Sequence, residues 1–301
     1  MANLKDIKSR ITSVQNTKKI TKAMKMVAAA KVKKAENTVK AGRPFSDELL
    51  HLFRKLVATV SGFSVEGLKV ERGLDNYQAL LTGREIKTEG ILVITSNKGL
   101  AGAYNANVIK AALKRIRENT EKGIKSVIYP VGQKAISAFK NKSGDFEMKD
   151  GYINVANEPS ATGANLIAED IAEDFVSGSI DKIEIITTHF NNMMSYNVVN
   201  WEVLPVKTEK AETHELDPIM EYEPSAHAVL QQLVPMYITN SIYQALLEAN
   251  ASELASRMTA MSAASNNAEE MINTLTIDYN KARQWAITQE LVEIVSGASA
   301  I

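Results

Sequence analysis

A heptad pattern near the C-terminus constrains the fold of this chain more than any other feature. Apolar or small residues recur there at alternating spacings of three and four, at Met258, Met261, Ser265, Ala268, Ile272, Leu275, Tyr279, Ala282 and Ala286. This spacing predicts a helix that packs along a second helix as a coiled coil. Neither proline nor glycine occurs between Met236 and Ser296, so the helix can be long. We expect it to start near Pro224 and Pro235 and to stop at Gly297.

The first 60 residues offer a partner for that helix. Their apolar residues also follow helical spacing, at Leu4, Ile7, Ile11 and Val14 and then, after the polar Thr17, at Ile20, Met24 and Val27. Nothing within this segment can bury such a stripe, so it needs a second helix. We expect a break at Gly42-Arg43-Pro44 or at Ser61-Gly62, and we expect the two terminal helices to pair in antiparallel fashion.

The middle of the chain has a different rhythm. Apolar runs typical of buried strands occupy residues 90–95, 126–129, 183–187 and 201–204, and helical patterns occupy 106–118, 133–139 and 164–175. This alternation predicts an α/β domain with a mostly parallel sheet. The expected fold class mixes α+β and α/β: a long antiparallel two-helix coiled coil from the N- and C-terminal helices, plus an inserted Rossmann-like α/β domain. The expected division is 1–60 N-terminal coiled-coil helix, 61–88 connection, 89–207 α/β domain, 208–224 connection and 225–301 C-terminal coiled-coil helix.

Positive charge gathers near the N-terminus although the whole chain is neutral. Lys+Arg and Asp+Glu both total 35, but residues 1–40 hold eleven basic and two acidic side chains, a net charge of +9. The spacing of Lys18, Lys19, Lys22 and Lys25 places these four on one helix face. Such a face suits an acidic protein surface, nucleic acid or anionic lipid. No aromatic residue lies among these lysines, which argues against single-stranded nucleic acid.

No pattern of catalytic or metal-binding residues is found in the sequence. The chain has no cysteine, and its four histidines lack the spacing of metal ligands. It also lacks a Gly-x-Ser-x-Gly elbow. The loop 96–105 contains Gly99 and Gly102 but fits neither phosphate-binding template, so we expect these glycines to serve a tight turn. We therefore expect no catalytic, cofactor or metal site.

Three segments and a loop resemble one known family. Residues Ile7–Lys31 resemble the opening of the gamma chain of F-type ATP synthases, and Arg257–Ala268 and Tyr279–Ala298 resemble its closing helix. The loop Ser96–Asn105 is similar to the family's central Gly-Leu-x-Gly loop. The order and span of these segments fit the family, and the resemblance is to gamma chains of bacterial type.

The resemblance implies the central-stalk rotor of a proton-driven ATP synthase. In this reading the terminal helices stand inside a ring of alternating alpha and beta chains. The α/β domain binds the epsilon chain and the membrane c-ring. Rotation of the c-ring drives the catalytic beta chains through their conformations, while this chain carries no catalytic residues of its own. No transit sequence is visible, so we expect the cytoplasmic side of a bacterial cell membrane, which the chain touches only through the complex.

The resemblance also implies which residues contact the ring. The lever contacts, which face an acidic segment of a beta chain, are Lys18, Lys19, Lys22, Met24 and Lys25. The catch contacts, which meet a loop of a beta chain or lie in the polar region below it, are Arg257, Arg283 and Gln284. The bearing contacts are Thr288 and Glu290. Two positions depart from the family pattern, since Trp285 stands where a small residue is usual and Lys98 where arginine is expected.

Two other functions are open from the residues alone. One is a coiled-coil adaptor whose basic arm binds nucleic acid or anionic lipid, and it predicts a steep salt dependence of that binding. The other is an α/β enzyme that binds a nucleotide at the Gly99–Gly102 loop, and it predicts nucleotide binding by the isolated chain. A rotor does neither, yet co-purifies with an ATPase ring.

Overall fold

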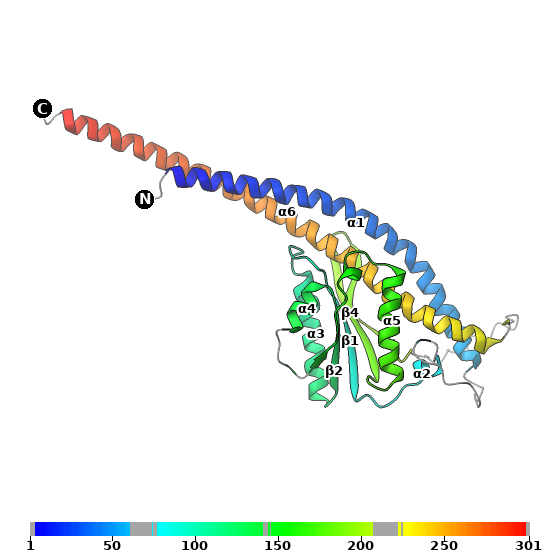
Figure 1. Ribbon diagram of the computed structural model, residues 1–301. Coiled ribbons are helices and arrows are strands. Elements are labelled where there is room, and N and C mark those ends of the chain that lie inside the picture. The colour runs from blue at the N-terminus through cyan, green and yellow to red at the C-terminus, as the bar shows by residue number, and fades with distance from the viewer. Residues whose placement is uncertain are drawn as a thin grey trace. The chain divides into compact units, whose positions relative to one another are not determined.

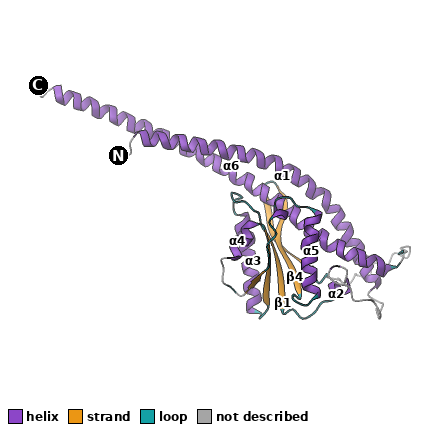
Figure 2. Cartoon of the chain, viewed as in Figure 1, coloured by secondary structure: helices purple, strands orange, loops and turns teal. Residues whose placement is uncertain are grey.

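The computed structural model describes residues 4–60, 74, 77–140, 144, 146–206, 222–223 and 225–298. Its first and last elements are two long helices, α1 (Leu4–Val60) and α6 (Ala226–Ala298) (Figures 1 and 2). Between them follow, in chain order, α2 (Tyr77–Leu81), β1 (Thr88–Ile94), α3 (Tyr104–Glu121), β2 (Lys125–Val131), α4 (Gln133–Lys140), β3 (Phe146–Met148), the 3-10 turn η2 (Asn154–Ala156), α5 (Ala161–Val176), β4 (Lys182–Asn192) and β5 (Ser195–Leu204).

The chain forms two compact units, and each long helix contributes to both. One unit consists of Met1–Ala30 and Arg257–Ile301, and we call its two helical segments the terminal helix pair. The other unit is Lys31–Ser256, and we call its segments of α1 and α6 the domain helix pair. The five-part division expected from the sequence stays a prediction, because residues 61–73, 75–76, 207–221 and 224 in or beside its two connections lie outside the described residues.

A five-stranded sheet forms the centre of the unit Lys31–Ser256. Its strand order is β3-β2-β1-β4-β5, with parallel pairing from β3 to β4 and antiparallel pairing of β4 with β5. The prediction of a mostly parallel sheet is therefore confirmed. All four predicted strands and all three predicted helices of the domain are present, but β4 and β5 are more than twice as long as predicted and β1 ends at Ile94, one residue before the predicted end. The sequence reading missed β3 and α2. These two elements are only three and five residues long, which is too short for a periodic pattern.

Alternate residues of the central strand face two separate cores. Ile91 and Val93 of β1 pack with α3 and α4, in a cluster that includes Val108 and Phe139. Their neighbours in β1 pack on the opposite face, against α5 and the domain helix pair. This alternation follows from the two-residue period of a strand. Helices thus cover both faces of the sheet, which explains why the predicted strand 90–95 reads as a continuous apolar run (Figure 1).

The two segments of the domain helix pair run antiparallel. Phe53 of α1 stacks on Tyr237 of α6 with ring centroids 5.0 Å apart, while Arg43 meets Glu248 further along the pair. The predicted break at Gly42-Arg43-Pro44 is wrong, because Pro44 lies inside α1. Gly42 instead allows close packing, since an added Cβ would lie 2.9 Å from Oε1 of Gln244. The described part of α1 extends to Val60, and the second predicted break, at Ser61-Gly62, lies outside the described residues.

In the terminal helix pair, the predicted C-terminal seam is confirmed by burial. All nine seam residues from Met258 to Ala286 are buried or half-buried. Between Ala268 and Ala286, all residues outside the seam are exposed. The spacing of three and four therefore identifies the buried side of this helix correctly. Helix α6 continues to Ala298, one residue past the stop expected at Gly297.

The N-terminal seam differs from the prediction at two positions. Leu4, Ile7, Ile11, Val14 and Met24 are shielded as expected, but Ile20 is 60% exposed and Val27 is 58% exposed. The shielded positions in their place are Lys18, Thr21 and Ala28. The three-four spacing simply continues past Val14, and it places two polar residues in the seam. Periodicity rather than residue polarity therefore decides which side of α1 is covered.

Candidate functional site

The glycine-containing loop after β1 satisfies its own polar groups. The amide oxygen of Asn105 accepts a hydrogen bond from the backbone N–H of Ser96 at 3.0 Å, and the hydroxyl of Ser96 donates to the carbonyl of Lys98 at 2.7 Å. The loop also caps the start of α4, where side-chain oxygens of Asn97 and Thr95 accept from backbone N–H groups of the helix. A phosphate at these positions would have to displace internal partners.

The crevice beyond the carboxyl ends of β1 and β4 is filled by α6. This is the position where open α/β sheets usually bind ligands, because the strand order reverses there. Leu246, Ala249, Asn250 and Glu253 of α6 line the space together with the end of β1 and Tyr104. The cavity left between them is about 10 Å³, which is the size of a single water molecule. Burial raises the pKa of Tyr104, so its hydroxyl stays protonated.

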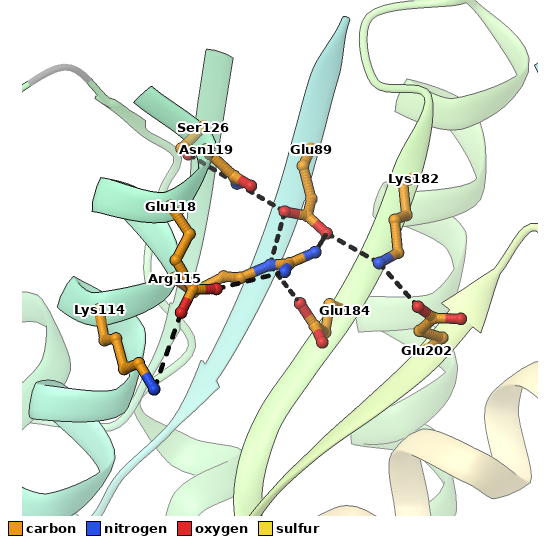
Figure 3. Close-up of polar contacts among 9 residues, drawn as sticks. All are labelled: Glu89, Lys114, Arg115, Glu118, Asn119, Ser126, Lys182, Glu184 and Glu202. Atoms are coloured by element: carbon orange, nitrogen blue, oxygen red, sulfur yellow. Dashed lines mark hydrogen bonds and ion pairs between the residues drawn. The ribbon is translucent and has the colours of Figure 1, made fainter. Parts of the chain in front are cut away.

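A buried network of charges lies at the opposite end of the strands and ties α3 to the sheet (Figure 3). Arg115 of α3 donates two hydrogen bonds to Glu89 of β1, at 2.9 and 2.7 Å, and its Nε lies 2.7 Å from a carboxylate oxygen of Glu184 in β4. Lys182 bridges Glu89 and Glu202, at 3.1 and 2.9 Å. Every one of these cations has a carboxylate partner, so the network fits a structural role.

The carboxylates of this network differ in pKa. Burial favours a raised pKa for Glu89, but hydrogen bonds from Arg115 and Asn119 and the charge of Lys182 outweigh it and hold the pKa of Glu89 below its usual value. Burial raises the pKa of Glu184, because the nearby cations compensate it less completely. The residues that the structure describes contain no group of His, Cys, Asp and Glu side chains arranged to hold a metal ion. No described helix has the length and apolarity needed to cross a bilayer.

The lever residues do not share one environment. Lys18 turns toward α6, where its ammonium lies 3.0 Å from the carboxylate of Glu269. Lys19, Lys22 and Lys25 are exposed and form no ion pair with any residue that the structure describes. The sequence predicts that all four lysines share one face. In the structure only three of them are exposed to solvent. Met24 is half-buried in the seam.

Four of the five catch and bearing residues lie in the last turns of α6. Arg283, Gln284 and Glu290 are exposed, and the exposed Thr288 donates its hydroxyl hydrogen to the carbonyl of Gln284 at 2.9 Å. The fifth residue, Arg257, is where the α6 segment of the terminal helix pair begins, and it is half-buried. Apolar side chains are exposed among them, at Trp285, Ile287, Leu291, Val292, Ile294 and Val295. An apolar helix end of this kind marks a surface that another protein covers.

A full-length match to one protein family decides what this arrangement belongs to. The ATP synthase family model matches residues 3–301. The ATP synthase gamma chain of Gloeothece citriformis (strain PCC 7424) is 40% identical over 329 aligned residues, which cover 100% of both chains. The chain belongs to the ATP synthase gamma-chain family. The gamma chain of Synechococcus sp. (strain JA-3-3Ab) is likewise 40% identical over 327 aligned residues, with 100% of both chains covered.

Chains in solved ATP synthase structures have a similar fold. A chain in the central stalk and c-ring structure of the Tetrahymena thermophila mitochondrial ATP synthase superposes with a TM-score of 0.58 at 29% identity, covering 82% of this chain and 99% of that one. A chain of the Euglena gracilis mitochondrial ATP synthase rotor superposes with a TM-score of 0.62 at 16% identity, covering 94% and 98%. The predicted fold class and family resemblance are confirmed. As a gamma chain, the protein is a non-catalytic subunit of ATP synthase, and neither the adaptor nor the enzyme alternative is supported.

Sequence reasoning missed one candidate contact surface of this gamma chain. Ile20, Met26 and Val27 project from the outer side of α1, close in sequence to the three exposed lysines. The reading from the sequence placed Ile20 and Val27 in the seam, because it favoured apolar residues over an uninterrupted spacing. Continuing the three-four pattern through Lys18 and Thr21 would have left both residues outside.

Proposed function

We propose that this gamma chain is the central-stalk rotor of a proton-driven ATP synthase in a bacterial cell membrane, on its cytoplasmic side. The carrying observation is the full-length family match together with a terminal helix pair whose seam is shielded and whose outer faces are not. In this function the helices turn inside a ring of alpha and beta subunits. The α/β domain connects them to the epsilon subunit and the c-ring.

The terminal helix pair supports this role through the way it divides its surface. One side of each helix is covered by the other helix. Torsion is therefore carried by two helices and the packed seam between them, instead of by one helix. The outer sides expose lysines on α1 and apolar side chains on both helices. A shaft needs such a division, because it must hold together by itself and still press on the subunits around it.

The exposed lysines are the contacts that we assign to the beta-chain lever. Lys19, Lys22 and Lys25, with Lys18 and Met24 beside them, face an acidic segment of a beta subunit in this proposal. Exposed ion pairs contribute only about 0–1 kcal/mol each, so they can form and break as the shaft turns. The same reasoning assigns Arg257, Arg283 and Gln284 to the catch and Thr288 and Glu290 to the bearing.

The energy available to such a rotor explains why the shaft must be stiff. One proton that crosses about 100 mV delivers roughly 2.3 kcal/mol. Several crossings must therefore be combined for one ATP, and their work has to pass through this chain as torque. A protein that is only an adaptor has no need for a seam sustained over the length of its terminal helices.

Reconstitution of the complex tests the proposed function. Membrane vesicles are prepared that carry ATP synthase with a tagged copy of this chain. The alpha, beta and epsilon subunits and the c-ring are expected to co-purify with the tagged chain. These vesicles are expected to acidify their interior when ATP is added, and vesicles that lack the chain are not. A chain that co-purifies with none of these subunits, or that binds DNA or anionic vesicles with a steep salt dependence, would contradict the proposal.

A further inference from the structure

A single buried carboxylate joins three elements within the unit Lys31–Ser256. Glu248 of α6 is only 1% exposed. It accepts hydrogen bonds from Nε and Nη2 of Arg43 in α1, at 2.9 and 3.1 Å. The backbone N–H of Phe190 in β4 and the side-chain amide of Gln244 also donate to it, at 2.7 and 3.2 Å. We call Arg43, Phe190, Gln244 and Glu248 the Glu248 junction.

Arg43 connects the junction back to the sheet. Its Nη2 donates a further hydrogen bond to the carbonyl of Phe190 at 2.8 Å. The N–H of Phe190 therefore binds the carboxylate while its carbonyl binds the guanidinium. One strand residue is held by both members of an ion pair that itself bridges the two helices of the domain helix pair. The relative positions of α1, α6 and β4 are thereby fixed at one place.

Apolar packing covers the Glu248 side of the junction, whereas the side chain of Arg43 stays 34% exposed. Phe190 packs in a cluster with Val32 and Val39 of α1 and with Leu247 and Ala251 of α6. Hydrogen bonds to charged groups are stronger than neutral ones, and a low local dielectric strengthens them further. The junction is therefore a strong contact at the place where the helices meet the sheet.

The hydrogen bonds of the junction are directional, whereas the apolar contacts around it are not. Apolar contacts depend on the area removed from water and have little directional preference, so they define the relative orientation of two elements less sharply than a hydrogen bond does. A bidentate guanidinium–carboxylate contact requires a fixed geometry. Two neutral contacts nearby, from Asn240 to Ser46 and from Thr187 to the carbonyl of Ala245, each join only two of the three elements.

We propose that the Glu248 junction is the torsional joint of the rotor, through which the α/β domain and the domain helix pair turn as one body. Arg43 and Glu248 act as positioning residues that resist twisting of the helices against the sheet. This inference rests on the proposed function, in which torque enters at the domain and leaves along the helices.

Torsional stiffness of the rotor is the quantity that tests this joint. The chain has no cysteine, so a probe can be attached at the exposed position 117 of α3 through Arg117→Cys. The assembled alpha–beta–gamma head is fixed to a surface by its ring, and the angular variance of the probe is recorded without turnover. In the double variant Arg43→Met/Glu248→Met, which replaces the pair with side chains that fill space, we expect at least twice the angular variance of the parent.

A second ion pair in the same helix provides the matched control. Lys40 and Glu36 form a contact of 2.7 Å within α1 and join no other element. The double variant Glu36→Met/Lys40→Met is expected to leave the angular variance unchanged. Equal variance in the parent and in Arg43→Met/Glu248→Met would overturn the proposal, and so would an equal increase in both double variants.

A conservative variant tests the proposal if Arg43→Met/Glu248→Met does not assemble. Arg43→Lys keeps the positive charge but loses the second donor of the fork, so we again expect a raised variance, smaller than in the double variant. Unchanged variance in Arg43→Lys would overturn the joint in that case. The proposed function is tested separately, because a parent complex that shows no ATP-driven proton pumping contradicts the rotor itself, whatever the variants do.

Discussion

At the scale of single residues, Lys18 differs from the lysines beside it in what a substitution removes. Its ammonium contacts Glu269 within the terminal helix pair, whereas Lys19, Lys22 and Lys25 extend into solvent. Lys18 therefore contributes to the shaft itself, and the other three remain available to a partner. Their common spacing in the sequence concealed this difference.

Single substitutions of these lysines are predicted to be mild and their combination severe. Each exposed ion pair contributes about 0–1 kcal/mol, so Lys18→Ala, Lys19→Ala, Lys22→Ala or Lys25→Ala should change the ATPase rate by less than about fivefold. The variant with all four replaced should lose much of its ATP-driven proton pumping. Normal pumping by the quadruple variant, measured with a pH-sensitive dye in vesicles, would show that the basic lever contact is wrong.

Arg283→Ala is predicted to lower turnover more than assembly. Arg283 is exposed near the end of α6 and has no part in the seam, so its loss leaves the helix pair intact. A lost hydrogen bond to a charged group costs about 1.5–3 kcal/mol, which corresponds to a fall of roughly tenfold or more in the ATPase rate per assembled complex. Asn280→Ala, one turn earlier on the same helix, is the control. Reduced assembly with normal turnover per complex would contradict the catch contact.

Glu89 and Glu184 are predicted to respond to pH in opposite directions. The lowered pKa of Glu89 stabilises the fold at neutral pH, and this contribution disappears as the pH falls below about 4.3. The raised pKa of Glu184 means that its ionisation opposes folding as the pH rises above about 4.3. At pH 7 we therefore expect Glu89→Gln to lower the free energy of unfolding by about 2 kcal/mol and Glu184→Gln to change it by less than about 1 kcal/mol.

Urea unfolding of the isolated subunit at several pH values measures both effects. The difference between Glu89→Gln and the parent should shrink as the solution is acidified. A difference that stays constant from pH 7 to pH 3 would refute the assignment of the pKa of Glu89. A large loss of stability in Glu184→Gln at neutral pH would refute the raised pKa of Glu184.

At the scale of whole elements, periodicity was the most reliable signal in the sequence. It identified the buried side of α6 between Met258 and Ala286, because small and apolar residues recur there at spacings of three and four without interruption. It misplaced the seam of α1 at Ile20 and Val27, where two polar residues occupy positions that face the partner helix. Thr21 is tolerated there because its hydroxyl donates to the carbonyl of Lys18 at 3.1 Å.

Tertiary contacts explain what the sequence reading could not supply. Pro44 predicts a break in α1, but packing of the domain helix pair against the sheet keeps the helix continuous. The Glu248 junction joins residues 43, 190 and 248, whose proximity no local pattern reveals. The ring contacts at the lever, catch and bearing came only from the family resemblance, and they stay predictions.

A buried charge in the seam is predicted to separate the two helices of the terminal pair. Ala268 is 6% exposed, and Ala268→Asp would bury a carboxylate in the seam beside Glu269, whose own carboxylate is already paired with Lys18. We expect a loss of about 3 kcal/mol in the free energy of unfolding of this pair, seen as a lower melting temperature in circular dichroism. Met271→Asp, three residues further on at an exposed position, is the matched control and should be nearly neutral. Equal effects of the two changes would contradict the seam.

At the scale of the whole molecule, the central claim is that this chain turns relative to the ring of alpha and beta subunits. A probe fixed at Arg117→Cys on the assembled alpha–beta–gamma head, observed one complex at a time while ATP is hydrolysed, tests this claim most directly. We predict continuous rotation of the probe in a single direction, at a rate set by the ATP concentration. A probe that stays at a fixed angle while the same complexes hydrolyse ATP would contradict the account.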